Sequence, residues 1–224
     1  MKLRTSLLSS ALAVGVVAGS PALAQDWYVQ GFLGYSFEEN FTPSGNIGGA
    51  PQSVFNDLSD GFNIGASVGR NFSLSNGINL RGEIELSYGE NDVDAVNFSG
   101  NGPGFENAVS GDIEATFLLA NLLVDFETGG PLTPYVGAGI GVGFIDQNIN
   151  YNNAVNISGD DEAFAAQLIA GASYKVNDTT SIFGDVRFIR AYDVSGTRTA
   201  PGGVASVSDD LDRTTLNVGV RFNF

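Results

Sequence analysis

The sequence predicts an all-β fold: an eight-stranded antiparallel up-and-down β-barrel that crosses a membrane. Three observations predict it. Apolar and polar residues alternate in eight extended segments, the connections between these segments alternate between long and short, and an aromatic residue of the last segment, Phe224, ends the chain. A period of two is the period of a β-strand. An even strand number with long loops at one end only is typical of outer-membrane barrels.

Residues 1–24 predict a signal peptide that is removed from the barrel domain, residues 25–224. Lys2 and Arg4 provide the positive start, and the apolar stretch that follows them is too short to span a bilayer. The small-x-small pattern Ala22-Leu23-Ala24 precedes the expected cleavage point. The sequence therefore predicts export at least to the periplasm rather than a retained transmembrane anchor.

Four predicted strands lie in the first half of the barrel domain. Their apolar positions share one face, which should contact lipid, while the other face carries mostly Gly, Ser, Asn and charged residues. The outward positions are Trp27, Val29, Leu33, Tyr35 and Phe37, then Phe62, Ile64, Ala66 and Val68, then Ile78, Leu80, Ile84, Leu86 and Tyr88, and then Leu118, Ala120, Leu122, Val124 and Phe126. Long polar stretches at 38–60 and 89–111 predict loops, and 75–77 predicts a tight turn.

Four more strands follow with the same pattern. Their outward positions are Pro134, Val136, Ala138, Ile140, Val142 and Phe144, then Phe164, Ala166, Leu168, Ala170, Ala172 and Tyr174, then Ile182, Val186 and Phe188, and then Leu216, Val218, Val220, Phe222 and Phe224. Loops are expected at 147–161 and 192–210, and short turns at 129–131 and 177–178. The glycines of 137–143 recur with strict period two, which predicts space for long lumen side chains rather than a nucleotide-binding loop.

Charged residues on the inward faces predict a polar network in the lumen. Its expected members are Arg81, Glu83, Glu85, Asp125, Lys175, Asp185, Arg187 and Arg221. Counted from the short turns, Glu83 and Glu85 should lie level with Asp185 and Arg187, and the other four should form a second layer nearer the turns. Eight strands enclose an interior only wide enough for side chains, where charges must be paired or hydrated. We therefore expect an ion-paired plug rather than an open channel.

The composition argues against several classes of function. The net charge is -15, from 25 acidic and 10 basic residues, which argues against a nucleic-acid partner. The chain has no Cys and no His, so it offers no disulfide, no thiolate metal site and no His-dependent catalysis. The acidic clusters lack the spacing of an EF-hand. We expect no cofactor, no metal centre and no enzymatic activity.

Two segments carry a resemblance to a known family. The strands at 120–126 (Ala-Asn-Leu-Leu-Val-Asp-Phe) and 134–143 (Pro-Tyr-Val-Gly-Ala-Gly-Ile-Gly-Val-Gly), with the terminal Phe, resemble the opacity-like, porin-family surface antigens. These are related in fold to the transmembrane domain of outer-membrane protein A. The resemblance implies an integral protein of the bacterial outer membrane, with surface loops of adhesive or antigenic role and without enzymatic activity.

The same resemblance suggests how the chain is delivered. An aromatic end on the closing strand resembles the sorting signal of outer-membrane proteins, so Phe222 and Phe224 are the expected assembly signal. The expected partners are outer-membrane lipid and lipopolysaccharide, the barrel-assembly machinery, and periplasmic chaperones in transit. We expect a monomer with both termini in the periplasm.

The expected loops and their flanks are strongly acidic. They hold 18 of the 25 acids: Glu38, Glu39, Asp57, Asp60, Glu90, Asp92, Asp94, Glu106, Asp112, Glu114, Asp146, Asp160, Asp161, Glu162, Asp193, Asp209, Asp210 and Asp212. Such a rim attracts cations, and salt screens it. The favoured hypothesis is a structural and surface-interaction protein with acidic extracellular loops, and the alternative is a narrow cation-preferring pore. The sequence names no ligand or receptor.

Overall fold

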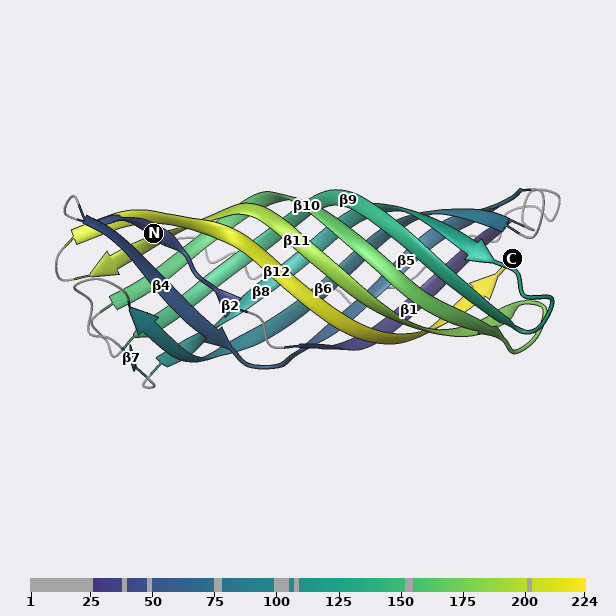
Figure 1. Ribbon diagram of the computed structural model, residues 1–224, viewed down its shortest axis with the longest axis horizontal. Helices are drawn as coiled ribbons and strands as arrows, with labels where there is room; N and C mark the ends of the chain where they lie inside the picture. The colour runs from purple at the N-terminus through teal and green to yellow at the C-terminus, as the bar shows by residue number, and fades with distance from the viewer. Residues whose placement is uncertain are drawn as a thin grey trace, which may run out of the picture.

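The computed structural model describes residues 26–37, 40–47, 50–74, 78–98, 105–106, 109–151, 155–200 and 203–224. Within them, eight long strands form a closed antiparallel barrel (Figure 1). These strands are β1 (Trp27–Ser36), β5 (Gly61–Ser73), β6 (Ile78–Phe98), β8 (Val109–Phe126), β9 (Leu132–Tyr151), β10 (Val155–Lys175), β11 (Thr180–Ala200) and β12 (Gly203–Asn223). The predicted eight-stranded up-and-down barrel is confirmed.

The barrel closes where its first strand meets its last. Val29 lies opposite Phe222 and Tyr35 lies opposite Leu216 across the β1–β12 seam. The other edge of β1 pairs with β5. The Phe224 amide adds a hydrogen bond to the carbonyl of Trp27, at 3.0 Å. Closure gives each of the eight strands two neighbours, so backbone groups that lipid could not satisfy are paired within the protein.

The two ends of the barrel differ. One end, here called the turn end, holds the start of β1, the end of β12 and the short connections 127–131 and 176–179; the C-terminus marks it in Figure 1. The opposite end is called the loop end. The expected turns at 129–131 and 177–178 are confirmed, whereas the expected turn at 75–77 and the cleavage site at Ala22–Ala24 lie outside the described residues.

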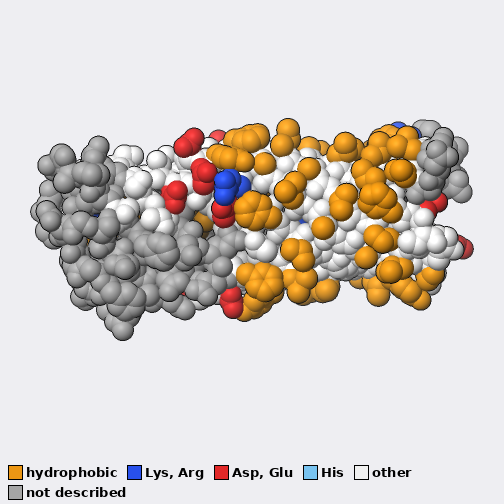
Figure 2. All heavy atoms as spheres, viewed as in Figure 1, with side chains coloured by type: hydrophobic (Ala, Val, Ile, Leu, Met, Phe, Trp, Pro, Cys, Tyr) orange, Lys and Arg blue, Asp and Glu red, His pale blue; other side chains and the backbone are white. Residues whose placement is uncertain are grey.

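A band of apolar side chains covers the outside of the turn-end half (Figure 2). Leu33 is 64% exposed, Leu168 61% and Ile140 60%. Outward apolar positions on β9 run from Leu132 to Phe144, which spans about 40 Å along the strand and about 30 Å along the barrel axis at a tilt of about 40°. That height matches the hydrocarbon core of a bilayer. The predicted lipid-facing pattern is confirmed. No helix in the described residues is long and apolar enough to cross a membrane.

The four polar stretches predicted to be loops are mostly strand, so that prediction was wrong in extent. Strands β6, β9, β10, β11 and β12 each run 20 or 21 residues, well past the apolar band. On β9, Asp146 and Asn148 point outward beyond Phe144, while Ile145 and Ile149 point inward and are buried. The period of two persists, but above the band the polar residues face water and the apolar ones face the lumen.

Short strands extend the wall further at the loop end. They are β2 (Asn40–Phe41), β3 (Ser44–Ile47), β4 (Ala50–Leu58) and β7 (Phe105–Glu106). Strand β4 pairs with β6, and β3 pairs with both β4 and β12. The segment between β1 and β5 therefore contributes strands to the wall where those two strands have ended.

Candidate functional site

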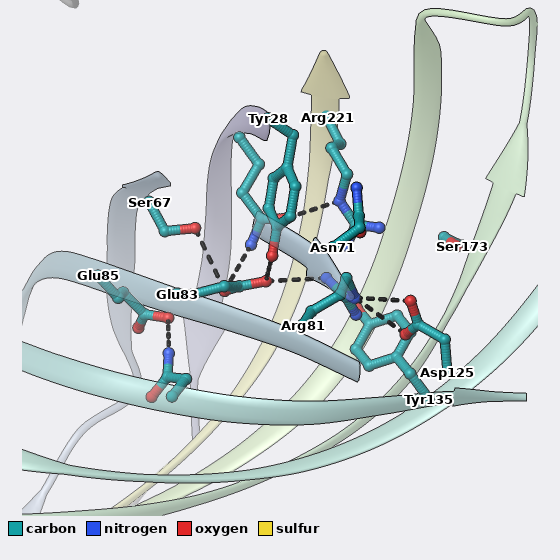
Figure 3. A network of polar contacts seen from close by, with 12 residues as sticks. Tyr28, Ser67, Asn71, Arg81, Glu83, Glu85, Asp125, Tyr135, Ser173 and Arg221 are labelled. Atoms are coloured by element: carbon teal, nitrogen blue, oxygen red, sulfur yellow. Dashed lines mark hydrogen bonds and ion pairs between the residues drawn. The ribbon is translucent and has the colours of Figure 1, made fainter. Parts of the chain in front are cut away.

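The inward charges nearest the turn end gather around Arg81 (Figure 3). Its guanidinium is fully buried and contacts Glu83 (Nη1 to Oε1, 2.8 Å) and Asp125 (Nε to Oδ2, 2.8 Å). Glu83 also accepts hydrogen bonds from the Tyr28 hydroxyl at 2.5 Å and from Gln30 Nε2 at 3.2 Å. Alternation on β6 directs Arg81 and Glu83 to the same lumen face, so two neighbouring charges on one strand form an ion pair.

A second group of charges is centred on Arg187, farther from the turns. Its side chain bridges Glu85 (Nη1 to Oε2, 2.7 Å) and Asp185 (Nε to Oδ1, 2.8 Å). The Tyr135 hydroxyl and the Asn217 amide each donate to Asp185 at 3.0 Å. The ring of Phe32 lies 4.0 Å from the guanidinium carbon, in the range of a cation–π contact. This cation is therefore held by two carboxylates and one aromatic face.

Seven of the eight predicted network residues are buried in the lumen, but their layers differ from the prediction. Glu83 belongs with Arg81 rather than with Arg187, because its carboxylate reaches toward Tyr28 on β1. Arg221 is buried and donates from Nε to Gln30 at 3.0 Å, which links it to the Arg81 group. Lys175 is not part of the network. It lies at the mouth of the turn end, 57% exposed, and pairs with Asp178 at 2.8 Å.

Most of the side chains that fill the loop-end half of the lumen are apolar, which the sequence interpretation missed. Phe117, Ile149, Ile157 and Ile189 are each at most 1% exposed. The complete cluster is Val93, Ile113, Ala115, Phe117, Leu119, Ile145, Ile149, Tyr151, Ile157, Ala163, Ala165, Ile189, Ala191, Val194, Val207 and Leu211. Below it lie the ion pairs. Arg198 and Arg213 are also buried in the loop-end half, and Arg213 donates to Asn91 at 2.7 Å, so this half is mainly apolar but carries two cations. The sequence contains the pattern that predicts this cluster: inward positions in the stretches expected to be loops, such as Ile149 and Ile157, are apolar.

The inward glycines of β9 make room for their neighbours on β8, as predicted. A Cβ atom at Gly139 would overlap Asn121 Oδ1, and one at Gly143 would lie 2.8 Å from the Phe117 ring. Asn121 donates to Glu85 at 2.9 Å and accepts from Gln167 at 2.7 Å. Glycine at 139 therefore leaves the space that a bridging amide of the network occupies.

Outside the barrel, a row of carboxylates marks the loop-end border of the apolar band. Glu90, Glu114, Asp146 and Asp160 lie directly opposite one another across β6, β8, β9 and β10. We call these four residues the acidic ladder. On the face that Figure 2 shows, acidic side chains gather along this border together with a basic one. Like charges directly opposite across a strand pair repel. Burial, then the nearby carboxylates of Asp160 and Glu114, raise the pKa of Asp146 above its ordinary value.

Other predicted loop acids already have partners. Asp210 accepts from the Asp193 amide at 3.0 Å and Asp161 accepts from the Ser195 amide at 2.6 Å. Asp212 forms a bidentate pair with Arg190. These three acids therefore already have partners within the protein. Glu38 and Glu39 lie outside the described residues, as do the side chains of Asp57, Asp94 and Glu106. In the described part of the chain, no group of three or more acidic side chains has an arrangement that could hold a metal ion.

The comparisons agree with this architecture. Residues 9–224 match the family model of the outer membrane protein beta-barrel domain. The chain belongs to this outer-membrane β-barrel family. An uncharacterized protein of Brucella suis biovar 1 is 27% identical over 224 residues, covering 88% of this chain and 75% of the relative. A second uncharacterized protein, from Brucella abortus, is 25% identical with the same coverage.

Solved structures of other outer-membrane barrels share the fold. The outer membrane protein OprG of Pseudomonas aeruginosa has a TM-score of 0.63 at 14% identity, covering 90% of this chain and 96% of that one. Neisserial surface protein A has a TM-score of 0.54 at 16% identity, with 88% and 97% covered. The outer membrane protease OmpT of Escherichia coli has a TM-score of 0.57 at 5% identity, with 88% and 97% covered. At these identities the similarity concerns the fold.

Membership of the family places the apolar band of this outer-membrane barrel in the bilayer of the bacterial outer membrane. The buried ion pairs then lie inside the membrane-spanning half, and the acidic ladder lies at one edge of it. Two regions can act chemically in different ways. The lumen can hold charges in fixed pairs, and the loop end can present an unbalanced negative surface to molecules outside the barrel.

Proposed function

We propose that this outer-membrane barrel is a structural and surface-interaction protein whose acidic loop end faces the cell exterior. In this proposal the turn end and both termini face the periplasm, and the protein works as a monomer. The observation that carries the proposal is the separation of charge. The lumen residues pair with one another, whereas the acidic ladder is unbalanced and points outward. Cationic or cation-bridged partners fit such a surface.

The packed interior supports this role over that of a cation-preferring pore. An ion crossing the barrel would pass the Arg81 and Arg187 groups and then the apolar cluster around Phe117 and Ile149. Moving an ion through an apolar region without water costs many kcal/mol. A conducting path would therefore require the whole apolar cluster to rearrange.

Catalysis is not part of the proposal. The chain has no His, the usual general base near neutral pH. Glu83 and Glu85 each contact a buried arginine, which supports a structural role for both as ion-pair partners. The resemblance to a protease structure at 5% identity supports a common fold and carries no argument for proteolysis.

The proposed partners in delivery and in the membrane follow from the same geometry. Phe222 and Phe224 lie on the closing seam, where a terminal recognition element is accessible before β1 and β12 pair. We infer that periplasmic chaperones and the barrel-assembly machinery bind this segment during export. Outer-membrane lipid and lipopolysaccharide then surround the apolar band.

A binding experiment on the purified barrel in nanodiscs tests the surface role. The probe is a lysine homopolymer, and the variant replaces Glu114, Asp146 and Asp160 by Gln, Asn and Asn. The matched control is Asp178→Asn, which removes an exposed acid at the turn end. We expect binding of the homopolymer to weaken several-fold in the triple variant, to be unchanged in the control, and to fall as salt shortens the screening length from ~10 Å at 0.1 M to ~3 Å at 1 M. Equal binding by parent and triple variant would refute the role of the ladder.

A further inference from the structure

A hollow interrupts the apolar band in its turn-end half. It has a volume of about 790 Å³ and its lining is almost entirely apolar. Six neighbouring strands contribute to it, in the order β5, β1, β12, β11, β10 and β9. At a strand spacing of about 4.8 Å, this row extends about 24 Å across the sheet. The hollow is therefore a long shallow trough in the lipid-facing wall.

Two outward glycines create the trough. Gly31 on β1 and Gly184 on β11 point outward, like the lipid-facing residues of these strands. The outward side chains of Leu33 and Val218 also line the trough. A Cβ at Gly31 would lie 3.9 Å from its nearest neighbour, and one at Gly184 would lie 3.6 Å away, both ordinary contacts. This contrasts with the inward Gly139, where a Cβ would overlap Asn121. Packing inside the protein therefore does not require glycine at 31 or 184. The space that these glycines leave is open to a molecule outside the barrel.

A cation lies near the trough at the edge of the band. Arg70 follows Ile64 and Val68 in the outward alternation of β5, and its side chain is 44% exposed. Its guanidinium carbon lies 5.8 Å from the Trp27 ring and 5.5 Å from the Phe72 ring. Its carboxylate neighbour, Asp26, is 3.5 Å away and exposed. This arrangement holds the guanidinium at the rim, where Nη2 faces Asp26 and 44% of the side chain remains exposed to a ligand.

The pairing register connects the cation to the trough. Arg70 lies opposite Trp27, and Gly31 lies opposite Ala66, four residues farther along both strands. Four residues of strand correspond to about 13 Å along the strand, or about 10 Å along the barrel axis at a tilt of about 40°, which lies within the ~15 Å depth of one leaflet. A lipid whose phosphate is at Arg70 therefore has its chains at the level of the trough.

We propose that this face binds one membrane glycerophospholipid, with its phosphate on Arg70 and an acyl chain in the trough at Gly31 and Gly184. The trough is continuous with the lipid-facing band, so its occupant is a molecule of the bilayer. A single guanidinium matches a single phosphodiester. Arg70 lies at the turn-end border beside one carboxylate, Asp26, whereas the other border carries the four carboxylates of the acidic ladder. The cation therefore assigns the ligand to the turn-end leaflet, and the phosphate competes with Asp26 for Arg70.

Native mass spectrometry of the mature barrel tests this proposal. The protein is folded into detergent, incubated with phosphatidylglycerol vesicles and then delipidated. We expect the parent to retain one lipid. Arg70→Gln should reduce retention up to about fivefold, since an exposed charge pair contributes at most ~1 kcal/mol. Gly31→Leu and Gly184→Leu, which fill the trough, should reduce it at least about tenfold, because several methylene groups lose their contact.

Matched controls separate this site from general lipid contact. Ala120→Leu enlarges an exposed outward residue on β8, a strand that does not line the trough and does not adjoin Arg70, and it should retain lipid as the parent does. Equal retention by parent and Gly31→Leu, or an equal loss in Ala120→Leu, would overturn the proposal. Retention of lipid A in place of phosphatidylglycerol would overturn the assignment of the ligand. A dimer that Gly31→Leu abolishes would show instead that a second copy fills the trough.

The proposal rests on the membrane orientation given in the proposed function, and its failure is distinguishable from failure of the surface role. Binding of the lysine homopolymer is measured on the same Gly31→Leu and Arg70→Gln proteins and should be unchanged. Loss of lipid with intact homopolymer binding supports the trough. Heat-modified migration on gels verifies that each variant is folded, and Arg70→Gln provides a test at an exposed position that folding does not depend on.

Discussion

Removing the cation at the centre of the lumen tests how the barrel interior is stabilised. Arg187→Leu leaves Glu85 and Asp185 buried without the guanidinium that contacts both, at 2.7 and 2.8 Å. Breaking a buried ion pair by deleting one partner costs about 3–5 kcal/mol, because the remaining charge is desolvated and uncompensated. Two carboxylates share this loss, so we expect a cost at the upper end of that range.

The chain provides a matched control in Lys175→Gln. The Lys175–Asp178 pair has the same separation, 2.8 Å, but its side chains are 57% and 96% exposed. Solvent screening limits such a pair to about 1 kcal/mol or less. Urea unfolding of both variants in the same lipid vesicles should therefore give midpoints that differ clearly.

A double variant identifies the cause of the loss. Arg187→Leu combined with Glu85→Leu removes one stranded charge, and Asp185 still accepts from Tyr135 and Asn217. We expect it to recover a large part of the stability that Arg187→Leu loses. The ion-pair account of the lumen is wrong if the free energies of unfolding of Arg187→Leu and Lys175→Gln differ by less than about 1 kcal/mol. It is also wrong if the double variant is less stable than Arg187→Leu alone.

Three further predictions concern the ladder, the orientation and assembly. The raised pKa of Asp146 means that its ionised form destabilises the fold, so stability is fully present below the ordinary Asp pKa of about 4 and declines as pH rises through the raised value. Asp146→Asn should therefore raise stability by about 0.2–1 kcal/mol at pH 7 and by nothing near pH 3, as measured by urea midpoints. With no native Cys to interfere, Val204→Cys at the loop end should react with an impermeant maleimide on intact cells, and Asp178→Cys at the turn end should not; the reverse pattern would invert the orientation. Deleting Phe224 should slow assembly and lower the amount of heat-modifiable protein, and an unchanged yield would show that the terminus is not an assembly signal.

The lipid-facing half of the barrel could be predicted from the sequence because one physical rule governs it. Inside the bilayer an outward residue must be apolar and an inward one is free to be polar, so Ile84 and Glu83 fall on opposite faces by alternation alone. Closure of β1 on β12 also follows, since no strand edge is stable in lipid. The inward charges on β6 and β11 therefore meet, as Glu85 and Arg187 do.

The loop-end half could not be predicted in the same way. Beyond Phe144 the outside is water, so the rule reverses: Asp146 points outward and Ile145 inward. An interpretation that expects apolar residues on the outer face finds polar residues there and therefore predicts a loop. The position of Lys175 was predicted wrongly for a different reason. The alternation of β10 places its side chain on the inner face, but it does not show that the residue lies at the mouth of the barrel rather than inside the lumen. Its position at the mouth of the barrel leaves it exposed to Asp178.

Single-channel recording in planar lipid bilayers tests the central claim, a closed barrel that acts through its surface, most directly. The parent is first reconstituted in vesicles, where heat-modified migration on gels verifies that it is folded, and the vesicles are then fused with the bilayer. The account predicts no steady conductance for the inserted parent, because the apolar cluster around Phe117, Ile149 and Ile189 fills the lumen above the ion pairs. Steady, cation-selective conductance by this folded protein would contradict the account and would favour the pore.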